Sequence, residues 1–503
     1  MNRLEQIQNA VQKGREALLA LDFVYPRSVR EIKGEFIFLA RLEKSKHLFT
    51  GPAGALSREF EGETRALLRV CPLSPGNAAS LRRLFPFTSP AAIGNRPSFG
   101  TGDRMGLATP GHVRAFMKYD IFPVLAQQSM REMTRTHRTA QEVLDDATFG
   151  VFQEGYEGGF GADADHIKTA EDALMCLSTG FTMFTVDAAD HINKKGNSLP
   201  DNEAVKLLNE SPDNAALRAA YLDKKIRFEE NGRAVEIEYT EASLGKALAV
   251  YGRAVRHMAD VYAALRKASK GRAFDFEVSI DETDAVTLPR DHFFVANELK
   301  RLKVDFQSLA PKFVGQFQKG IDYIGDPREF ERQFSEHAII ARRLGDYKLS
   351  IHSGSDKFTV FPVIGKYSQG HFHGKTAGTS WLEAVRVVAV KAPVLYRQMH
   401  KFALTKFEKD RQSYHVTTDI DGIPDVDAMQ DAELPMLLDM VDSRQLMHIT
   451  YGSILSTKNI IGHLFFREEM NRILFENEEL HYQFLSKHIE RHLETLGVKK
   501  KEG

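Results

Sequence analysis

Cysteine and tryptophan are scarce in this sequence of 503 residues, which has two cysteines and one tryptophan. Cys71 and Cys176 form no CxxC pair, which excludes a disulfide scaffold and a thiolate zinc site. No GxGxxG turn follows a predicted strand. No stretch approaches the roughly 18 uninterrupted apolar residues of a membrane span, and the N-terminal segment is amphipathic, unlike a signal peptide. We therefore expect a soluble, cytoplasmic protein with no membrane partner.

An excess of charge of one sign is also missing. The chain has 67 Lys and Arg against 68 Asp and Glu, a net charge of −1. This balance implies no nucleic-acid partner and no anionic membrane surface. A small-molecule substrate is the expected partner, and a homo-oligomer is compatible with the sequence.

What the chain does contain is a regular alternation of strands and helices. Residues 1–95 predict a small α+β domain, with its clearest strand in "EFIFLARL". Residues 96–394 contain eight repeats of a strand, a polar or glycine-rich loop and a helix, with a helical insertion around 192–270 that includes one hairpin. Residues 395–503 predict a mainly helical C-terminal extension. Eight such units indicate an α/β protein with a closed (β/α)8, TIM-like barrel; an open doubly wound sheet is the alternative.

The polar faces of several strands predict where the site lies. The fifth strand, in "FDFEVSIDET", alternates Asp275 and Glu277 with apolar residues, and the seventh, in "DYKLSIHSG", places Ser350 and His352 on one face. The sixth is expected in "KFVGQFQKGID", with Gln316 on its polar face. A barrel interior is normally filled with branched apolar residues. Polar side chains pointing inward therefore indicate an active site at the carboxyl ends of the strands.

Three imidazoles at or near strand ends are candidate metal ligands: His166, His352 and His373. Such a set suits zinc, nickel, manganese or a similar divalent ion, with positions left open for a substrate. His371 has the same strand parity as His373 and is an alternative. A rival set on the fourth strand fits a helix cap and salt bridge better: Asp187, Asp190 and His191.

Carboxylates near these histidines are the acid–base candidates. Asp165 adjoins His166, and Glu277 lies on the polar face of the fifth strand. A carboxylate enclosed near a cation can accept a proton from a substrate hydroxyl. Asp281 and Glu282 in the following loop are alternatives.

Basic and hydroxyl residues just past the strand ends are candidates for binding the substrate. Lysines recur after the third, seventh and eighth strands, and "HGKTAGTSWLEA" resembles an anion-binding turn that leads into a helix N-terminus. The candidate substrate-binding residues are Lys168, Asp281, Ser353, Lys357, Lys375 and Thr376.

The segments "LSIHSGSDKF", "HGKTAGTSWLEA", "EVSIDET" and "GADADHIK" resemble the tagaturonate epimerase family. These enzymes interconvert tagaturonate and fructuronate, and relatives act on tagatose and fructose. The resemblance implies a divalent metal held by the three histidines already named, with Asp165 and Glu277 as the proton-transfer pair.

The chemistry expected from that resemblance is inversion at carbon 4 of a ketohexuronate. The C–H bond at carbon 4 is β to the ketone and is not acidified by it, so simple proton abstraction is unfavourable. Retro-aldol cleavage and re-addition, assisted by a metal, would solve this. A metal-dependent aldose–ketose isomerase or aldolase, and a non-catalytic sugar-acid binding protein, are the alternatives.

Overall fold

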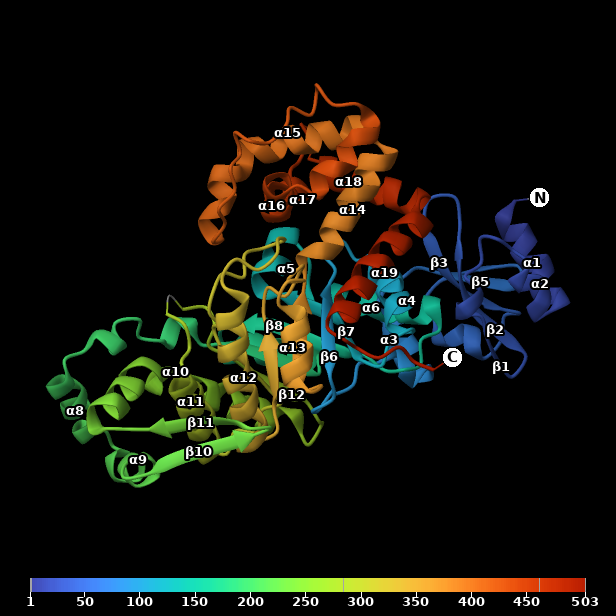
Figure 1. The fold of residues 1–503 in the computed structure, drawn as a ribbon. Coiled ribbons are helices and arrows are strands. Elements are labelled where there is room, and N and C mark those ends of the chain that lie inside the picture. Colours follow the sequence, from blue (N-terminus) through green and yellow to red (C-terminus); the bar gives the residue numbers. More distant parts are fainter. Residues whose placement is uncertain (1, 284, 461, 503) are drawn as a thin grey trace.

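A closed barrel of eight parallel strands forms the centre of the molecule, in the order β12-β13-β14-β15-β6-β7-β8-β9 (Figure 1). The structure is a computed structural model and describes residues 2–283, 285–460 and 462–502. The barrel strands are β6 (Ser98–Gly102), β7 (Phe122–Ser129), β8 (Gly161–Ile167), β9 (Met183–Asp187), β12 (Asp275–Ser279), β13 (Ser308–Ala310), β14 (Lys348–Ile351) and β15 (Phe372–Thr376). The predicted TIM-like barrel is confirmed, and the open sheet is excluded.

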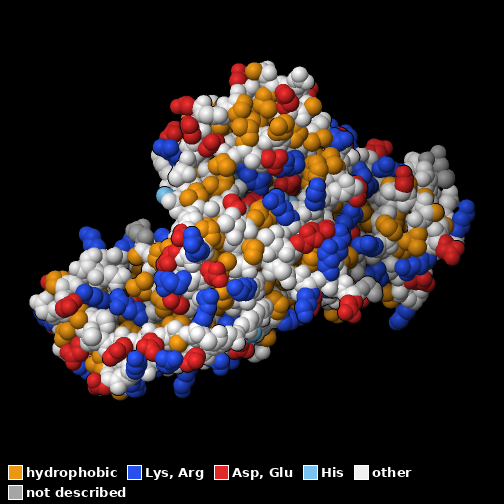
Figure 2. Space-filling model, in the orientation of Figure 1, with side chains coloured by type: hydrophobic (Ala, Val, Ile, Leu, Met, Phe, Trp, Pro, Cys, Tyr) orange, Lys and Arg blue, Asp and Glu red, His pale blue; other side chains and the backbone are white. Residues whose placement is uncertain are grey.

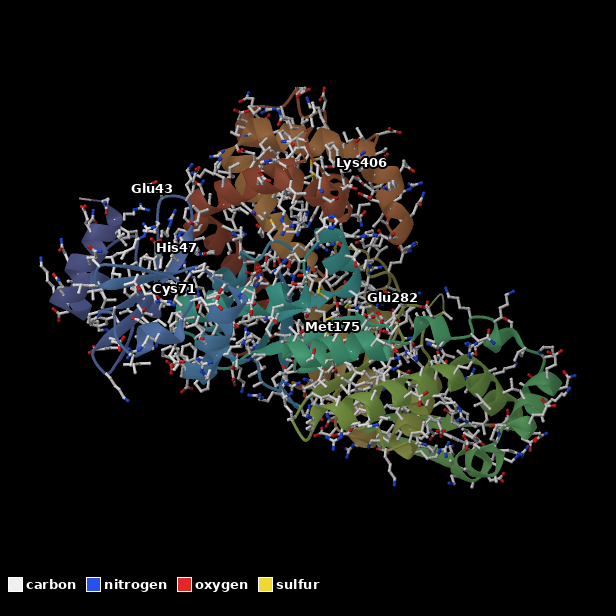
Figure 3. The ribbon with its side chains drawn as sticks, turned by 180° about the vertical axis from the view of Figure 1, so that it is seen from behind. Glu43, His47, Cys71, Met175, Glu282 and Lys406 are labelled. Atoms are coloured by element: carbon white, nitrogen blue, oxygen red, sulfur yellow. The ribbon has the colours of Figure 1, made fainter. Side chains whose placement is uncertain are left out.

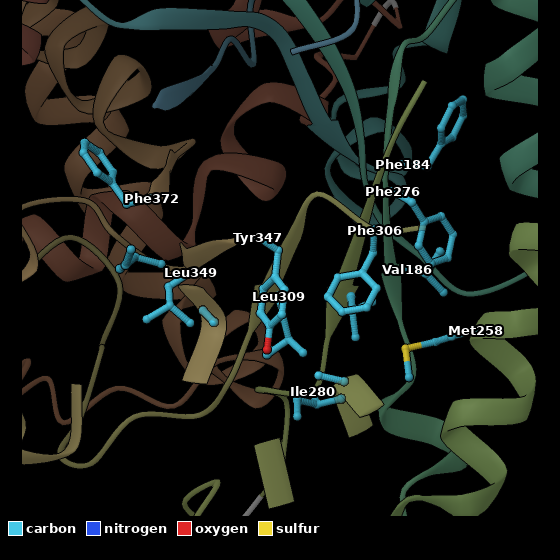
Figure 4. Close-up of a cluster of buried hydrophobic side chains, with 14 of the residues drawn as sticks. Phe184, Val186, Met258, Phe276, Ile280, Phe306, Leu309, Tyr347, Leu349 and Phe372 are labelled. Atoms are coloured by element: carbon cyan, nitrogen blue, oxygen red, sulfur yellow. The ribbon is translucent and has the colours of Figure 1, made fainter. Parts of the chain in front are cut away.

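Helices surround the barrel and cover the apolar faces of its strands. They are α4 (Thr109–Phe116), α5 (Met130–Thr136), α6 (Ala140–Glu154), α7 (Ala170–Thr179), α11 (Pro289–Arg301), α12 (Pro327–Leu344), α13 (Phe361–Ser368) and α14 (Gly378–Lys391). Phe276, Leu309 and Leu349 point outward into this packing and are at most 1% exposed (Figure 4). Alternate residues of the same strands are therefore left to face the barrel interior.

The sixth strand is not where the sequence pattern predicts it. The strand is β13, only three residues long, and the segment 312–322 is a loop with a single bridge from Gln316 to Ile324. The apolar spacing in that segment has another cause, since Phe313 and Phe317 pack against Phe330 of α12. Gln316 therefore belongs to a loop at the rim of the barrel.

The N-terminal residues form a separate sheet in the order β1-β2-β3-β5-β4, at the right of Figure 1. Its elements are α1 (Arg3–Lys13), α2 (Arg15–Leu19), β1 (Arg30–Ile32), β2 (Glu35–Arg41), β3 (Lys46–Gly51), β4 (Glu63–Arg65), β5 (Leu68–Cys71) and α3 (Pro75–Leu84). The strand predicted in "EFIFLARL" is β2.

The segment between β9 and β12 extends from the barrel at the lower left of Figure 1. It contains α8 (Asp201–Glu210), α9 (Asn214–Tyr221), β10 (Lys225–Glu230), β11 (Arg233–Glu238) and α10 (Glu241–Ser269). The antiparallel pairing of β10 with β11 confirms the predicted hairpin.

Most of the C-terminal helices gather above the carboxyl ends of the strands (Figure 1) and share a hydrophobic core with α14, whereas the last of them packs against α4 and adds Ile489 and Leu493 to the core of the barrel. They are α15 (Pro393–Asp410), α16 (Val441–Ile449), α17 (Tyr451–Ser456), α18 (Phe465–Glu476) and α19 (Glu478–Thr495). Hydrophobic side chains remain on their outer surface (Figure 2), among them Val394, Met436 and Val441. None of the described helices is long and apolar enough to cross a lipid bilayer.

Shortening Leu349 to alanine tests the outward packing of the barrel. The side chain is 1% exposed, so we expect a loss of about 2–5 kcal/mol from its transfer and the cavity left behind. The midpoint of thermal unfolding, followed by circular dichroism, should fall. Val394→Ala is the control, because Val394 is 68% exposed and such surface changes usually stay within about 0.5 kcal/mol. Equal midpoints for the two variants would contradict this packing.

Candidate active site

A cavity opens at the carboxyl ends of the barrel strands, beneath the C-terminal helices. Its volume is about 50 Å³, and it adjoins a groove of about 650 Å³. Its lining residues are Arg104, Gln127, Ser129, Arg131, Glu132, Asp165, His166, Lys319, Gly320, His352, Ser353, Ser355, Lys375, Ala377, Gly378, Tyr414 and His448. The lining is dominated by charged and hydrogen-bonding groups, as a polyhydroxylated ligand requires.

Two histidines at the base of the cavity are each oriented by a carboxylate. His166 Nδ1 lies 2.9 Å from Asp165 Oδ1, and His352 Nε2 lies 2.8 Å from Glu277 Oε1. A carboxylate that accepts a hydrogen bond from one ring nitrogen leaves the other nitrogen with a lone pair, which is the usual arrangement of metal-binding histidines. These contacts therefore leave His166 Nε2 and His352 Nδ1 available as ligands.

The two available nitrogens converge with Asp281. One ligand atom from each of His166, His352 and Asp281 lies within 4.8 Å of the other two. His352 Nδ1 is buried and lies 3.0 Å from Asp281 Oδ1, with which it forms a salt bridge when the ring is protonated. Glu282, in the loop after β12 (Figure 3), lies 3.6 Å from His166 Nε2. Two imidazoles and a carboxylate suit zinc, nickel or manganese, so these residues fit a divalent cation.

The backbone turns sharply where these side chains enter the cavity. His166 and Ser353 have φ values of 53° and 50°, in the left-handed region that side-chain-bearing residues seldom adopt. The register between β8 and β9 shifts between Ala164 and Ile167, the stretch that contains His166. An irregularity of this kind redirects a side chain at a strand end, and here it brings His166 toward His352, with ring centres 4.9 Å apart.

Lys375 connects four strands beneath the histidines. Its Nζ lies 2.8 Å from carboxylate oxygens of Asp163, Asp165 and Glu277. It also donates a hydrogen bond of 2.5 Å to Thr185 Oγ1. An ammonium group has three donors, so the carboxylates and the hydroxyl saturate it. The carboxylates act on the histidines as well: against the effect of burial, Asp281 and Glu277 raise the pKa of His352 to about 10, and Asp165 raises the pKa of His166.

The pKa values in this cluster follow from burial and charge. Burial would lower the pKa of Lys375, but its three carboxylates hold it well above the usual range. Burial would raise the pKa of Asp165, but His166 and Lys375 hold it well below its usual range. Burial raises the pKa of Asp163 to about 6 despite Lys375. Asp165 and Lys375 are therefore an ionised pair at the cavity wall.

The structure does not bring His373 into the histidine group. His373 lies two residues before Lys375 on β15, is fully buried, and hydrogen-bonds through Nδ1 to Ser98 Oγ at 2.9 Å. Burial lowers its pKa to about 3. Its rival His371 pairs with Asp346 at 2.8 Å. Among the described residues, Asp281 takes the place in the group that strand parity predicts for His373.

The predicted substrate-binding residues are found in different places. Lys375 and Ser353 line the cavity, and Asp281 lines the groove that adjoins it. Lys168 is half-exposed and pairs with Asp190 at 2.8 Å, away from the cavity.

Two further predicted residues are buried in structural contacts. The hydroxyl of Thr376 donates to the carbonyl of Gly100 at 3.0 Å. Lys357 donates to the carbonyls of three loop residues and does not line the cavity.

Glu277, one of the two predicted proton-transfer residues, does not line the cavity. It is 0% exposed, and its second carboxylate oxygen accepts a hydrogen bond of 2.6 Å from Ser308. Asp165, the other predicted residue, lines the cavity. The pair is therefore split between the cavity wall and the layer behind it.

Several cavity residues carry no motif from which the sequence could predict them. Arg131 is on α5, Lys319 is in the loop after β13, and Tyr414 and His448 come from the C-terminal extension. Nothing in their spacing relates them to the barrel strands.

A second cluster of possible ligands connects α19 to the loop after β14. Asp356 Oδ1 is 3.0 Å from His488 Nε2, and Asp356 Oδ2 pairs with Arg444 at 2.7 Å. Both ring nitrogens of His492 are already used: Nε2 accepts from the backbone N–H of Asp356, and Nδ1 donates to the carbonyl of His488. We interpret this cluster as a contact that fastens the C-terminal helices to the barrel.

The fold and the cavity define a barrel enzyme that acts on a small polar molecule. The sequence profile of the tagaturonate epimerase family matches residues 25–496. The tagaturonate/fructuronate epimerase of Thermotoga maritima is 43% identical over 477 residues, which cover 94% of this chain and 96% of the relative. The chain therefore belongs to the tagaturonate epimerase family, whose members are isomerases.

Solved structures agree with this assignment. A glycerol complex of the fructuronate-tagaturonate epimerase of Cohnella laeviribosi is 46% identical, with a TM-score of 0.90 over 95% of this chain and 96% of that chain. The native structure of the same enzyme is 45% identical, with a TM-score of 0.91 over 98% of this chain and 100% of that chain.

Removing each of the three candidate ligands in turn tests which residues bind the cation. We expect His166→Ala, His352→Ala and Asp281→Ala each to weaken Mn²⁺ or Zn²⁺ binding by at least the roughly 10–100-fold seen when a residue supporting a metal ligand is lost. Isothermal titration calorimetry measures this. His373→Gln should bind the metal like the unaltered protein. Weakened binding in His373→Gln with normal binding in Asp281→Ala would overturn the assignment.

Proposed function

We propose that this chain interconverts tagaturonate and fructuronate by inverting carbon 4, with the help of a divalent cation. The observation that carries the proposal is the convergence of His166, His352 and Asp281 beside the Asp165–Lys375 pair in one cavity. The activities named for the Thermotoga and Cohnella relatives support the choice of substrate.

The position of the reacting carbon favours cleavage of a carbon–carbon bond. Carbon 4 is β to the ketone at carbon 2, so its C–H bond is not acidic. Loss of the proton from the carbon 4 hydroxyl instead lets the bond between carbons 3 and 4 break, with its electrons passing to carbons 2 and 3 as an enediolate. The fragment that ends in the carbon 4 aldehyde then presents its other face, and the same bond re-forms. Atoms and electrons balance without any oxidant or reductant.

Asp165 and Lys375 are suited to move the hydroxyl proton. Asp165 is held ionised at the cavity wall and can accept the proton and return it in re-addition, while the Lys375 ammonium 2.8 Å away stabilises the carboxylate. A divalent cation bound by the histidine group would supply Lewis acidity toward the ketone oxygen.

Glu277 lies behind the residues that line the cavity and acts on the substrate only through them. Its Oε1 lies 2.8 Å from both His352 Nε2 and Lys375 Nζ, so one carboxylate orients the histidine and the lysine together. Glu277 is therefore a positioning residue, and Asp165 is the acid–base residue.

Metal dependence and bond cleavage are tested together by NMR. Chelator-treated protein should leave tagaturonate unchanged, and restoring one divalent metal should produce fructuronate without solvent deuterium at carbon 4. Accumulation of two fragments would indicate an aldolase, and a shifted carbonyl an aldose–ketose isomerase. Conversion that survives rigorous chelation would contradict the metal requirement.

The division of roles between the two carboxylates is tested by Asp165→Asn and Glu277→Gln. We expect Asp165→Asn to lower kcat by about 10²–10⁴-fold, the usual contribution of general acid–base catalysis, and excess metal should not restore it. Glu277→Gln should weaken metal affinity about 10–100-fold through His352, and saturating metal should restore part of its activity.

Asp190→Asn is the control for both variants, because Asp190 only pairs with Lys168 at the surface. Full restoration of Asp165→Asn by excess metal would reverse the two assignments.

A further inference from the structure

Two of the cations that line the cavity, Arg131 and Lys319, form no salt bridge within the described residues, although Glu282 and Glu132 lie close enough to Arg131 to attract its charge. Four basic side chains line the cavity, and two of them are neutralised: Arg104 by Glu132 at 2.7 Å, and Lys375 by its carboxylates. Positive charge that is not paired in a salt bridge favours an anionic ligand group in the cavity.

Lys319 lies beside the catalytic groups and is held there. Its Nζ donates a hydrogen bond of 2.7 Å to Ser353 Oγ, and Ser353 directly follows the candidate ligand His352. Lys319 is half-buried and lines both the cavity and the adjoining groove. An ammonium group has three donors, and Ser353 uses one of them.

Lys357 holds the loop that carries Lys319 in place. The fully buried Lys357 Nζ donates to the carbonyls of Gln318 at 2.8 Å, Ile321 at 2.5 Å and Ser355 at 2.8 Å. These bonds clamp the backbone on both sides of Lys319. A charged side chain on a preorganised loop loses less conformational freedom when it binds a ligand.

The C-terminal extension also forms hydrogen bonds to the loop that carries Lys319. Gln445 of α16 donates to the carbonyl of Lys319 at 3.2 Å and to the Gln318 side chain at 3.1 Å. Thr417 also donates to Gln318, at 3.0 Å from its backbone N–H. Lys319 is thus placed by the barrel and the extension together.

Arg131 is placed by an aromatic residue of the extension. Its guanidinium carbon lies 5.4 Å from the centre of the Tyr414 ring, and the Tyr414 hydroxyl accepts a hydrogen bond of 2.6 Å from Arg135. Arg131, Tyr414 and Lys319 line both the cavity and the adjoining groove. Arg131 and Lys319 therefore face the same space, which His352 and Ser353 also line.

We propose that Lys319 and Arg131 form the subsite that binds the carboxylate of the substrate. The proposal rests on the proposed function, since it places a hexuronate in the cavity with its ketone end toward the histidine group. The carboxylate, at carbon 6, is at the opposite end of the sugar from the ketone and reaches toward the mouth. Charge-assisted hydrogen bonds to a carboxylate are among the strongest available, so this subsite makes the enzyme select a uronate over a neutral ketose.

The test compares Lys319→Met, Arg131→Met and Lys319→Arg with the unaltered enzyme. The carboxylate takes no part in bond cleavage, so we expect each methionine variant to raise the KM for tagaturonate about 10- to 100-fold while kcat changes little. Lys319→Arg should keep most of the affinity, because it retains the charge. Lys267→Met is the control and should behave normally, because Lys267 is exposed on α10 and lines neither the cavity nor the groove.

Neutral ligands separate a charge effect from a structural one. Inhibition by galactonate, which has the carboxylate, should weaken in Lys319→Met, and inhibition by galactitol, which lacks it, should not. An unchanged KM for tagaturonate, or equal losses for the charged and neutral ligands, would overturn the subsite. If the unaltered enzyme does not convert tagaturonate at all, the proposed function itself fails. That result can be told apart from an unchanged KM and from equal losses of the two inhibitors.

Discussion

The ion cluster around Lys375 is the interaction on which the site depends. The lysine comes from β15, two of its carboxylates from β8 and the third from β12, so one ammonium group ties together strands on opposite sides of the barrel. Breaking a buried cluster leaves uncompensated charge and is strongly destabilising. The same carboxylates orient His166 and His352, so the groups that hold the barrel interior together also aim the candidate ligands.

The surplus of carboxylates over cations in this cluster has a chemical consequence. Asp163, Asp165 and Glu277 surround a single lysine, and Asp281 adds a fourth carboxylate beside His352. These carboxylates favour a divalent cation beside His166 and His352, whereas Lys319 and Arg131 favour an anion in the same cavity. A substrate with a ketone at one end and a carboxylate at the other matches both preferences.

Strand parity and strand-end position made the barrel, His166 and His352 predictable, because both are local properties of the sequence. How deep a side chain lies within the barrel depends on the whole fold and cannot be predicted from neighbouring residues. His373 and Lys375 lie on the same face of their strand, yet only Lys375 reaches the cavity. The three-residue β13 was too short to produce a pattern, so the apolar loop after it was predicted as the strand. Arg131, Lys319 and Tyr414 meet only through the packing of the C-terminal extension on the barrel, for which the sequence has no periodic signal.

Anomalous diffraction at the manganese edge, from crystals of the protein soaked with Mn²⁺, tests the central claim most directly. The account predicts one strong peak at coordination distance from His166 Nε2, His352 Nδ1 and an Asp281 oxygen, with Glu277 and Asp165 still on the far nitrogens of the two rings. A peak at His373, or among Asp356, His488 and His492 with none at the base of the cavity, would contradict it.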